Sequence, residues 1–181
     1  MSLLNLIRWG GLAAMIAGVL FIVADLATLL VFVLTQAANE GALLFRSIAA
    51  LSAGILLLLG LVGLYARQSE AIGILGLVAF LVAFVGSVLQ RDFVWASMLA
   101  KLGWALFGAV SLDAGVYPQA AAVLLIIGAV LSGVINGFLA NTQPVASSAY
   151  FVSIVVFDII FYASVAWLGS SLFMGRSQEG S

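Results

Sequence analysis

The sequence lacks two residue types that carry much of protein chemistry: it contains no cysteine and no histidine. Without cysteine, disulfide bonds, thiolate nucleophiles and iron–sulfur clusters are excluded. Without histidine, a Ser-His-Asp triad and a histidine-ligated haem are excluded as well. No HExxH, GxSxG or P-loop motif is present. We therefore expect a protein that is not an enzyme and that carries no cofactor or metal.

Charge is also scarce. Only 7% of the 181 residues are charged, whereas 65% are hydrophobic, and a soluble domain has roughly 25% charged residues. Because so few charges cannot cover a surface that faces water, we expect the outer surface of the protein to face the lipid bilayer. The net charge of −1 gives no electrostatic reason for nucleic-acid binding.

Long apolar runs fill most of the chain. A membrane-spanning helix needs about 20 mostly apolar residues. The segments that meet this requirement are Trp9–Thr35, Leu43–Ala66, Ala71–Leu89, Phe93–Leu112, Gln119–Ala140 and Val145–Met174. The breaks between them are short, so consecutive helices should be antiparallel neighbours. We expect an all-α integral membrane protein, a six-transmembrane-helix bundle that forms a single domain over residues 1–181.

The fourth segment is the least regular, because it contains Lys101 and follows Arg91 and Asp92. A shallow interfacial helix followed by a short span is the alternative. We favour a full span, since Leu102–Leu112 alone is too short to cross about 30 Å.

The distribution of Lys and Arg predicts the orientation. With six spans, both termini lie on one side, together with Arg8, Arg67 and Arg176, while Arg46 and Arg91 lie on the other. The side that holds the termini thus has three arginines against two, and this excess of positive charge favours termini in the cytoplasm.

Small residues recur on two of the predicted helices. Gly133 and Gly137 form a GxxxG pattern in the fifth span, and Gly11, Ala14 and Gly18 form a stripe on the first. Small residues allow helix backbones to approach closely. Packing within the chain is the favoured interpretation, and a homo-oligomer interface is the alternative.

Three ionisable residues fall inside the predicted spans: Asp25, Lys101 and Asp158. Each costs at least about 2.5–3.5 kcal/mol at a helix centre, so such residues usually face the bundle interior and pair. At 1.5 Å per residue, all three lie roughly 12–20 Å below the non-cytoplasmic surface. We therefore predict one charge layer, in which Lys101 can reach either aspartate.

Three interpretations of this layer stay open. In the first, Lys101 and one aspartate form a structural ion pair, and the second aspartate is protonated or bonded to Tyr or Ser. In the second, a carboxylate cycles its proton in an ion-coupled site. In the third, Lys101 extends to the interface without a partner.

Other polar residues are assigned supporting roles. Ser97 and Trp104 share the face of Lys101, with a cation–π contact from Trp104 as one option, and Tyr162 lies one turn beyond Asp158. Asn136 adds polarity to the fifth span. A polar outer rim is predicted for the charged residues at span starts, which are Arg46, Arg91 and Asp92.

A resemblance to a known group of proteins is found in two segments, GLVGLYARQSEAIGILGLVAFLVAFVGSVL and WALFGAVSLDAGVYPQAAAVLLIIGAVL. In LYARQ, the Gly-rich helix that follows, LFG, the AGV turn and the proline, the chain resembles a loosely defined group of small bacterial multi-pass membrane proteins of unknown function. The resemblance covers roughly residues 55–130. It implies a bacterial inner-membrane helical bundle and transfers no site.

We therefore expect a non-enzymatic multi-pass membrane protein with a structural or accessory role, as a subunit of a larger membrane complex or as a homo-oligomer. The first alternative is a small proton- or ion-coupled transporter or channel that uses the Asp25, Lys101 and Asp158 layer. The second alternative is lipid or pigment binding. A transporter needs a solvated cavity that reaches these charges, whereas a scaffold should hold them sealed and paired.

Overall fold

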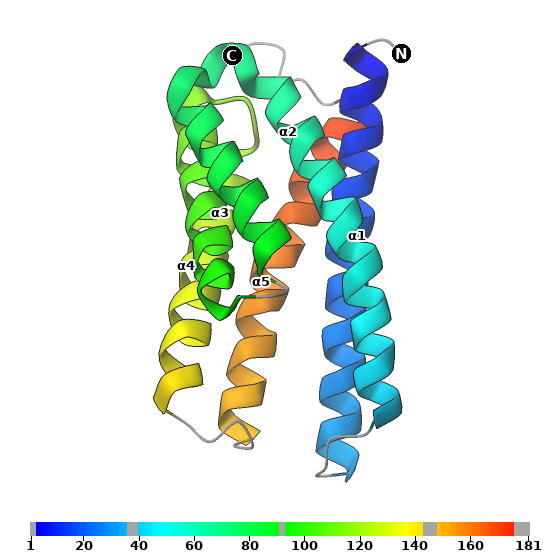
Figure 1. The fold of residues 1–181 in the computed structure, drawn as a ribbon. Coiled ribbons are helices and arrows are strands. Elements are labelled where there is room, and N and C mark those ends of the chain that lie inside the picture. The colour runs from blue at the N-terminus through cyan, green and yellow to red at the C-terminus, as the bar shows by residue number, and fades with distance from the viewer. Residues whose placement is uncertain (1–2, 36–39, 91–92, 143–147, 176–181) are drawn as a thin grey trace.

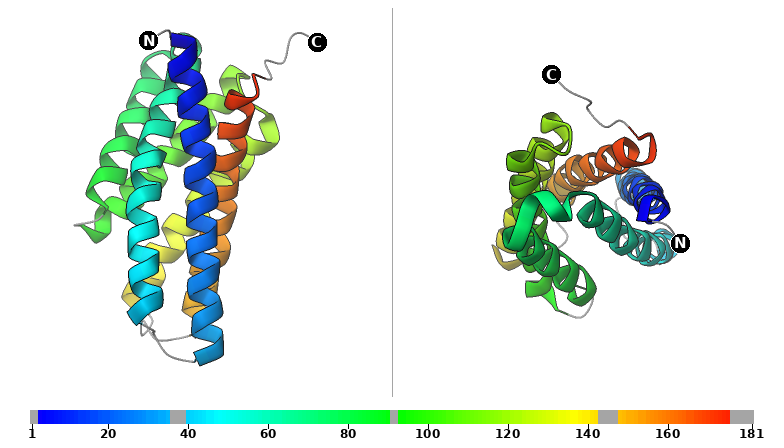
Figure 2. Two further views of the ribbon diagram at one scale, coloured as in Figure 1. Left: turned by 90° about the vertical axis from the view of Figure 1, so that its right-hand side faces the viewer. Right: turned by 90° about the horizontal axis from the view of Figure 1, so that it is seen from above.

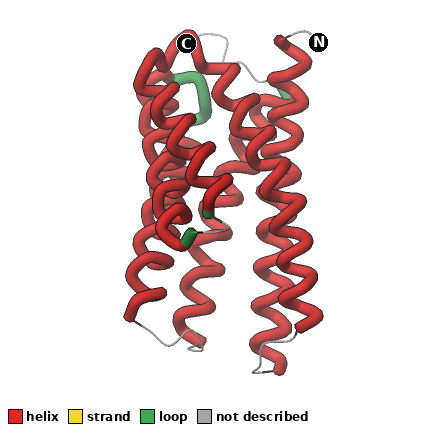
Figure 3. The backbone as a smooth tube through the Cα atoms, viewed as in Figure 1, coloured by secondary structure: helices red, strands yellow, loops and turns green. Residues whose placement is uncertain are grey.

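A computed structural model describes residues 3–35, 40–90, 93–142 and 148–175, and all regular structure in these ranges is helical. The helices are α1 (Leu3–Thr35), α2 (Glu40–Leu89), α3 (Val94–Ala114), α4 (Gln119–Thr142) and α5 (Ser148–Phe173) (Figure 1). The side chains of residues 42, 43, 94, 134–151 and 154 lie outside the description. The expectation of an all-α bundle with short connections is confirmed, as the tube in Figure 3 also shows.

Four helices in the described ranges are long and apolar enough to cross a membrane: Leu3–Thr35, Leu44–Leu89, Trp95–Ala114 and Val155–Phe173. A further apolar stretch, Gln119–Gly133, is shorter. Large hydrophobic side chains are exposed along these helices. The several long apolar helices thus suggest a membrane protein, with lipid against the exposed side chains.

The chain reverses direction inside α2, at Gly73. This residue has φ 53° and ψ −146°, a conformation that is open essentially to glycine alone. Tyr65 and Phe80 stack across the reversal with ring centroids 4.6 Å apart, whereas 15 residues of straight helix would separate them by about 22 Å. We call residues 40–72 the outgoing segment of α2 and residues 74–89 the return segment.

The break at Gly73 lies further along the chain than the predicted boundary between the second and third spans. The sequence RQSE, residues 67–70, was expected to be a loop, but it continues the helix. Arg, Gln and Glu are good helix formers, so polarity alone does not end a helix. The predicted spans 43–66 and 71–89 therefore belong to one helix that Gly73 divides.

The helices run alternately along one axis, and both termini lie at the same end (Figures 1 and 2). We call this the terminal end. The return segment and α3 form a short hairpin that stops part-way along the long helices α1, α4 and α5 (Figure 1). At 1.5 Å per residue the return segment is about 24 Å long, against about 50 Å for α1. α3 itself is one continuous helix from Val94 to Ala114, and not an interfacial piece followed by a short span.

The connection between α3 and α4 is anchored to α2. Gly115 caps α3 in the left-handed conformation (φ 64°), and its N–H donates to the Leu112 carbonyl. The Tyr117 hydroxyl then donates to the Leu64 carbonyl over 2.7 Å. Burial raises the pKa of the Tyr117 phenol, so the side chain remains a neutral hydrogen-bond donor at this position.

Close helix contacts are made through small residues. α1 packs against α2 and α5, α2 packs against α3, and α4 packs against α3 and α5. Gly10 of α1 faces Gly63 of α2 so closely that a β-carbon on Gly63 would lie 2.6 Å from the Gly10 Cα. On another face of α1, Gly18 lies against the Tyr162 carbonyl of α5. The predicted small-residue stripe therefore packs within the chain.

Substitution of two glycines on the outgoing segment should have opposite effects. We expect Gly63→Ala to lower the free energy of unfolding by about 1–3 kcal/mol, because the added methyl group overlaps α1 backbone. We expect Gly54→Ala, where the new β-carbon meets nothing within 4 Å, to be neutral or to raise it by up to about 1 kcal/mol through helix propensity. Unfolding of the detergent-solubilised protein measures both, and equal effects would contradict the close α1–α2 packing.

Candidate functional site

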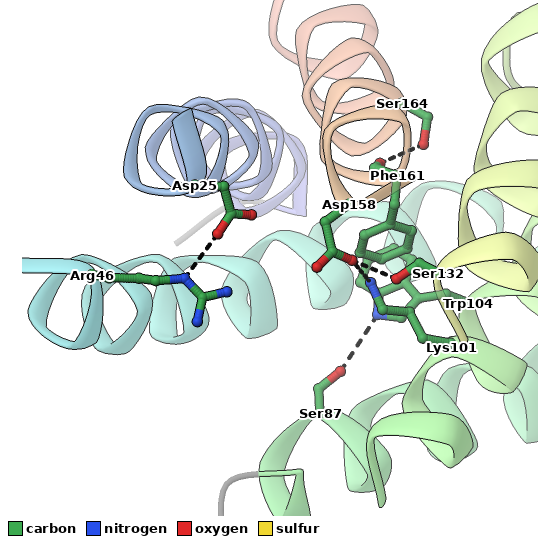
Figure 4. Close-up of polar contacts among 9 residues, drawn as sticks. All are labelled: Asp25, Arg46, Ser87, Lys101, Trp104, Ser132, Asp158, Phe161 and Ser164. Carbon is green, nitrogen blue, oxygen red and sulfur yellow. Dashed lines mark hydrogen bonds and ion pairs between the residues drawn. The ribbon is translucent and has the colours of Figure 1, made fainter. Parts of the chain in front are cut away.

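The centre of the bundle holds an ion pair between α3 and α5. Lys101 Nζ lies 3.1 Å from Asp158 Oδ1, and the two side chains are 9% and 10% exposed. Within the described residues the backbones of α3 and α5 make no close contact, so the long lysine side chain spans the interior (Figure 4). The structure thus brings together two of the three predicted layer residues.

The pair is closed in by hydrogen bonds and aromatic rings. The Ser132 hydroxyl of α4 donates to the same Asp158 oxygen. The Lys101 ammonium lies 3.7 Å from the centroid of the Phe161 ring and 5.1 Å from that of Tyr162. An ammonium over a ring face is attracted by the ring quadrupole, and the attraction grows when water is excluded. Both charges of the pair are therefore compensated without solvent.

Trp104 has a different role from the one expected. The described cation–π contacts of Lys101 use Phe161 and Tyr162 rather than Trp104. The indole N–H of Trp104 donates to the Ser87 hydroxyl over 3.4 Å, and its ring meets Phe161 edge-on with centroids 5.6 Å apart. Trp104 thereby connects α3 to the return segment and supports the ring beneath Lys101 (Figure 4).

Asp25 pairs with Arg46 and not with Lys101. The Arg46 Nε lies 3.0 Å from Asp25 Oδ1, with the aspartate side chain 4% exposed and the arginine side chain 43% exposed. Arg46 was predicted at an outer rim, but its long side chain reaches inward across the α1–α2 hairpin. The fourth charge makes the layer neutral, because two cations now face two carboxylates.

A cavity of about 570 Å³ opens beside this second pair. Its wall includes Arg46, Ala50 and Gly54, which share one face of the outgoing segment at four-residue spacing. The short hairpin contributes Ser87, Gln90 and Ser97 to the lining, α5 contributes Tyr162, and α1 contributes Phe21. The cavity thus reaches Arg46 directly, whereas Tyr162 stands between it and the Lys101–Asp158 pair.

Tyr162 is held in this position by stacking. Its ring lies parallel to Phe21 of α1, with centroids 4.1 Å apart and an interplanar angle of 10°. The same ring meets Phe161 edge-on with centroids 5.0 Å apart. A rigid aromatic side chain therefore forms the wall between the two charge pairs.

Gly133 creates the room for the lysine side chain. A β-carbon on Gly133 would lie 3.0 Å from the Lys101 Cβ, so the first glycine of the predicted GxxxG packs against α3 within the chain. Three residues of the predicted site lie outside the description: the side chain of Asn136, and Arg91 and Asp92 entirely. No metal-binding cluster of three acidic side chains occurs in the ranges that the structure describes.

Sequence reasoning missed Phe161, Ser87 and the inward reach of Arg46. Phe161 could have been found from its spacing, since it follows Asp158 by three residues and so shares its helix face. Ser87 gave a weaker signal as a hydroxyl in an apolar run. No family model, curated protein or solved structure matches this chain.

Removal of one partner of the central pair should destabilise the protein strongly. We expect Asp158→Asn or Lys101→Met to lower the free energy of unfolding by about 3–5 kcal/mol, because an uncompensated charge or a broken network remains buried. The double variant Lys101→Met/Asp158→Leu should lose much less than the sum. Unfolding in detergent measures all three, with the exposed Glu70→Gln as a control expected within about 0.5 kcal/mol of the unsubstituted protein. Additive losses would show that the two side chains are not coupled.

Proposed function

We propose that this chain is a non-enzymatic integral membrane protein with a structural or accessory role in a larger membrane assembly. The observation that carries the proposal is the closure of the central ion pair. Lys101 and Asp158 are each at most 10% exposed, Ser132 donates to the carboxylate, and the Phe161 ring lies against the ammonium. A charge that must exchange protons or ions needs access to water, and a closed, neutral pair is better suited to holding three helices in register.

Ion-coupled transport is the second candidate, and a separate observation favours it. Arg46 is 43% exposed and lines the cavity of about 570 Å³, so the cation that pairs with Asp25 is reachable, while the Asp25 side chain behind it is 4% exposed. In this candidate Asp25 is the group that exchanges a proton, Arg46 is its counter-ion, and the Lys101–Asp158 pair remains structural.

We further propose six passes through a bacterial inner membrane, with both termini in the cytoplasm. Support comes from the common location of the termini (Figure 1) and from Arg8 and Arg67, which line one pocket together with Leu4 and Gly175 near the two ends of the chain. The reversal at Gly73 supports this proposal, because it divides α2 into two antiparallel segments and so allows five helices to make six crossings.

The absence of cysteine makes the topology directly testable. Single-cysteine variants at polar positions that are exposed or, for Gln90, half-buried are treated in whole cells with a membrane-impermeant maleimide. We expect Glu40→Cys to be labelled in intact cells, and Glu70→Cys and Asp113→Cys only after the membrane is opened. Gln90→Cys, at the tip of the short hairpin, should be labelled from the same side as Glu40→Cys. Labelling of Gln90→Cys only after lysis would contradict six passes, and labelling of Glu70→Cys in intact cells would reverse the orientation.

The two candidate functions differ in vesicles. We expect the purified protein, reconstituted with a pH-sensitive dye inside, to carry no more protons than protein-free vesicles under an imposed potential. Tagged protein isolated from its native membrane in mild detergent should contain another integral membrane protein in fixed stoichiometry. A proton flux that Asp25→Asn abolishes and Glu70→Gln leaves intact would replace the accessory role by transport.

A further inference from the structure

A second pocket lies at the terminal end of the bundle, away from the two ion pairs. It has a volume of about 230 Å³, and its walls come from α1, α2, the α3–α4 connection and α5. Two cations line it, Arg8 from α1 and Arg67 from the end of the outgoing segment, and its remaining polar groups include Tyr117 and Ser171. The pocket therefore joins basic residues from two helices that are far apart in the sequence.

Among the described residues, no acidic side chain balances these cations. None of the residues that line the pocket is acidic. The ion pairs of the described part of the chain use Arg46 and Lys101, so neither Arg8 nor Arg67 has a carboxylate within 4.0 Å there. Two like charges facing one small space repel each other unless an anion binds between them.

The residues around the pocket position Arg8 and add no negative charge to it. The Arg8 guanidinium lies over the Phe173 ring, 6.0 Å from its centroid, which directs it toward the end of α5. The Tyr117 hydroxyl is bonded to the Leu64 carbonyl, so this phenol brings no negative charge into the site. The two guanidinium groups are therefore the charged groups of this pocket within the described residues.

We propose that the pocket between Arg8 and Arg67 binds a phosphate oxyanion, supplied by the headgroup of an anionic membrane lipid. The planar guanidinium groups of arginine match phosphate oxygens through paired N–H donors. The volume is below the roughly 300–1,000 Å³ of sites for drug-sized ligands, so it suits a compact anion. This binding site is independent of the role proposed for the charge pairs.

The position of the pocket favours a lipid over free phosphate as the source. Leu4 lines the pocket and is 70% exposed, and the exposed indole of Trp9 follows Arg8 directly. Tryptophan is typical of the headgroup level of a bilayer, and basic pockets between membrane helices bind anionic headgroups. A phosphate seated between the arginines would leave its acyl chains against the apolar surface beside Leu4.

The test uses the full-length protein, stripped of lipid in a neutral detergent. Binding of dioctanoyl phosphatidic acid is measured by calorimetry and by native mass spectrometry, with dioctanoylglycerol and inorganic phosphate as parallel probes. We expect phosphatidic acid to bind and dioctanoylglycerol not to bind. Arg8→Gln and Arg67→Gln should each weaken phosphatidic acid binding by about ten- to a hundredfold, as expected for loss of charge-assisted hydrogen bonds.

The control variant is Glu40→Gln, which removes an exposed charge at the opposite end of the outgoing segment and should leave this affinity unchanged. Arg67→Lys keeps the charge but loses the paired donors, so an intermediate loss is expected. Because Arg8 and Arg67 are exposed, their variants should fold normally, which the thermal midpoint without ligand checks. Binding of inorganic phosphate with the same arginine dependence would support the oxyanion site and assign a soluble source. Equal binding of dioctanoylglycerol, or unchanged affinity in Arg8→Gln and Arg67→Gln, would overturn the proposal.

Discussion

The ion pair between Lys101 and Asp158 is the interaction on which the arrangement of the second half of the bundle depends. It crosses an interior where the backbones of α3 and α5 do not approach each other within the described residues. Ser132 adds α4 to the same carboxylate. In an apolar surrounding a charge cannot exchange its partner for water, so one aspartate determines the relative register of three helices. Phe161 and Trp104 then complete the packing around the pair.

The short hairpin explains why a cavity reaches Arg46 of the second ion pair and neither member of the first pair. Because the return segment and α3 stop part-way along the bundle (Figure 1), one face of the outgoing segment lacks a helical neighbour there. Ala50 and Gly54 leave space on this face, and the cavity beside Arg46 is the result. The length of this hairpin thus leaves Arg46 accessible, whereas both members of the Lys101–Asp158 pair are sealed, although the two pairs consist of the same kinds of groups. The two candidate functions differ in which pair they use.

Several elements of the fold could be predicted from the sequence. The helices from Val94 and from Gln119 begin within one residue of their predicted starts, because turn residues and prolines flank uninterrupted apolar runs. The chain reverses at Gly73 and not at residues 67–70, where the sequence predicted the break. Residues 67–70 are compatible with a helix, and only a glycine accepts the backbone angles of the turn. The predicted span 71–89, already short, therefore becomes the return segment 74–89.

The sequence by itself determined that the chain forms apolar helices and that the charges of Asp25, Lys101 and Asp158 need partners. Both conclusions follow from the free energy of placing residues in an apolar medium. Which partner each charge meets was decided only by the tertiary structure. The estimated depths placed Lys101 within reach of either aspartate, but depth along a helix does not give the rotation of that helix about its axis. That rotation depends on close contacts such as Gly10 on Gly63 and Gly133 on Lys101. These contacts direct Lys101 to Asp158 and leave Asp25 to Arg46.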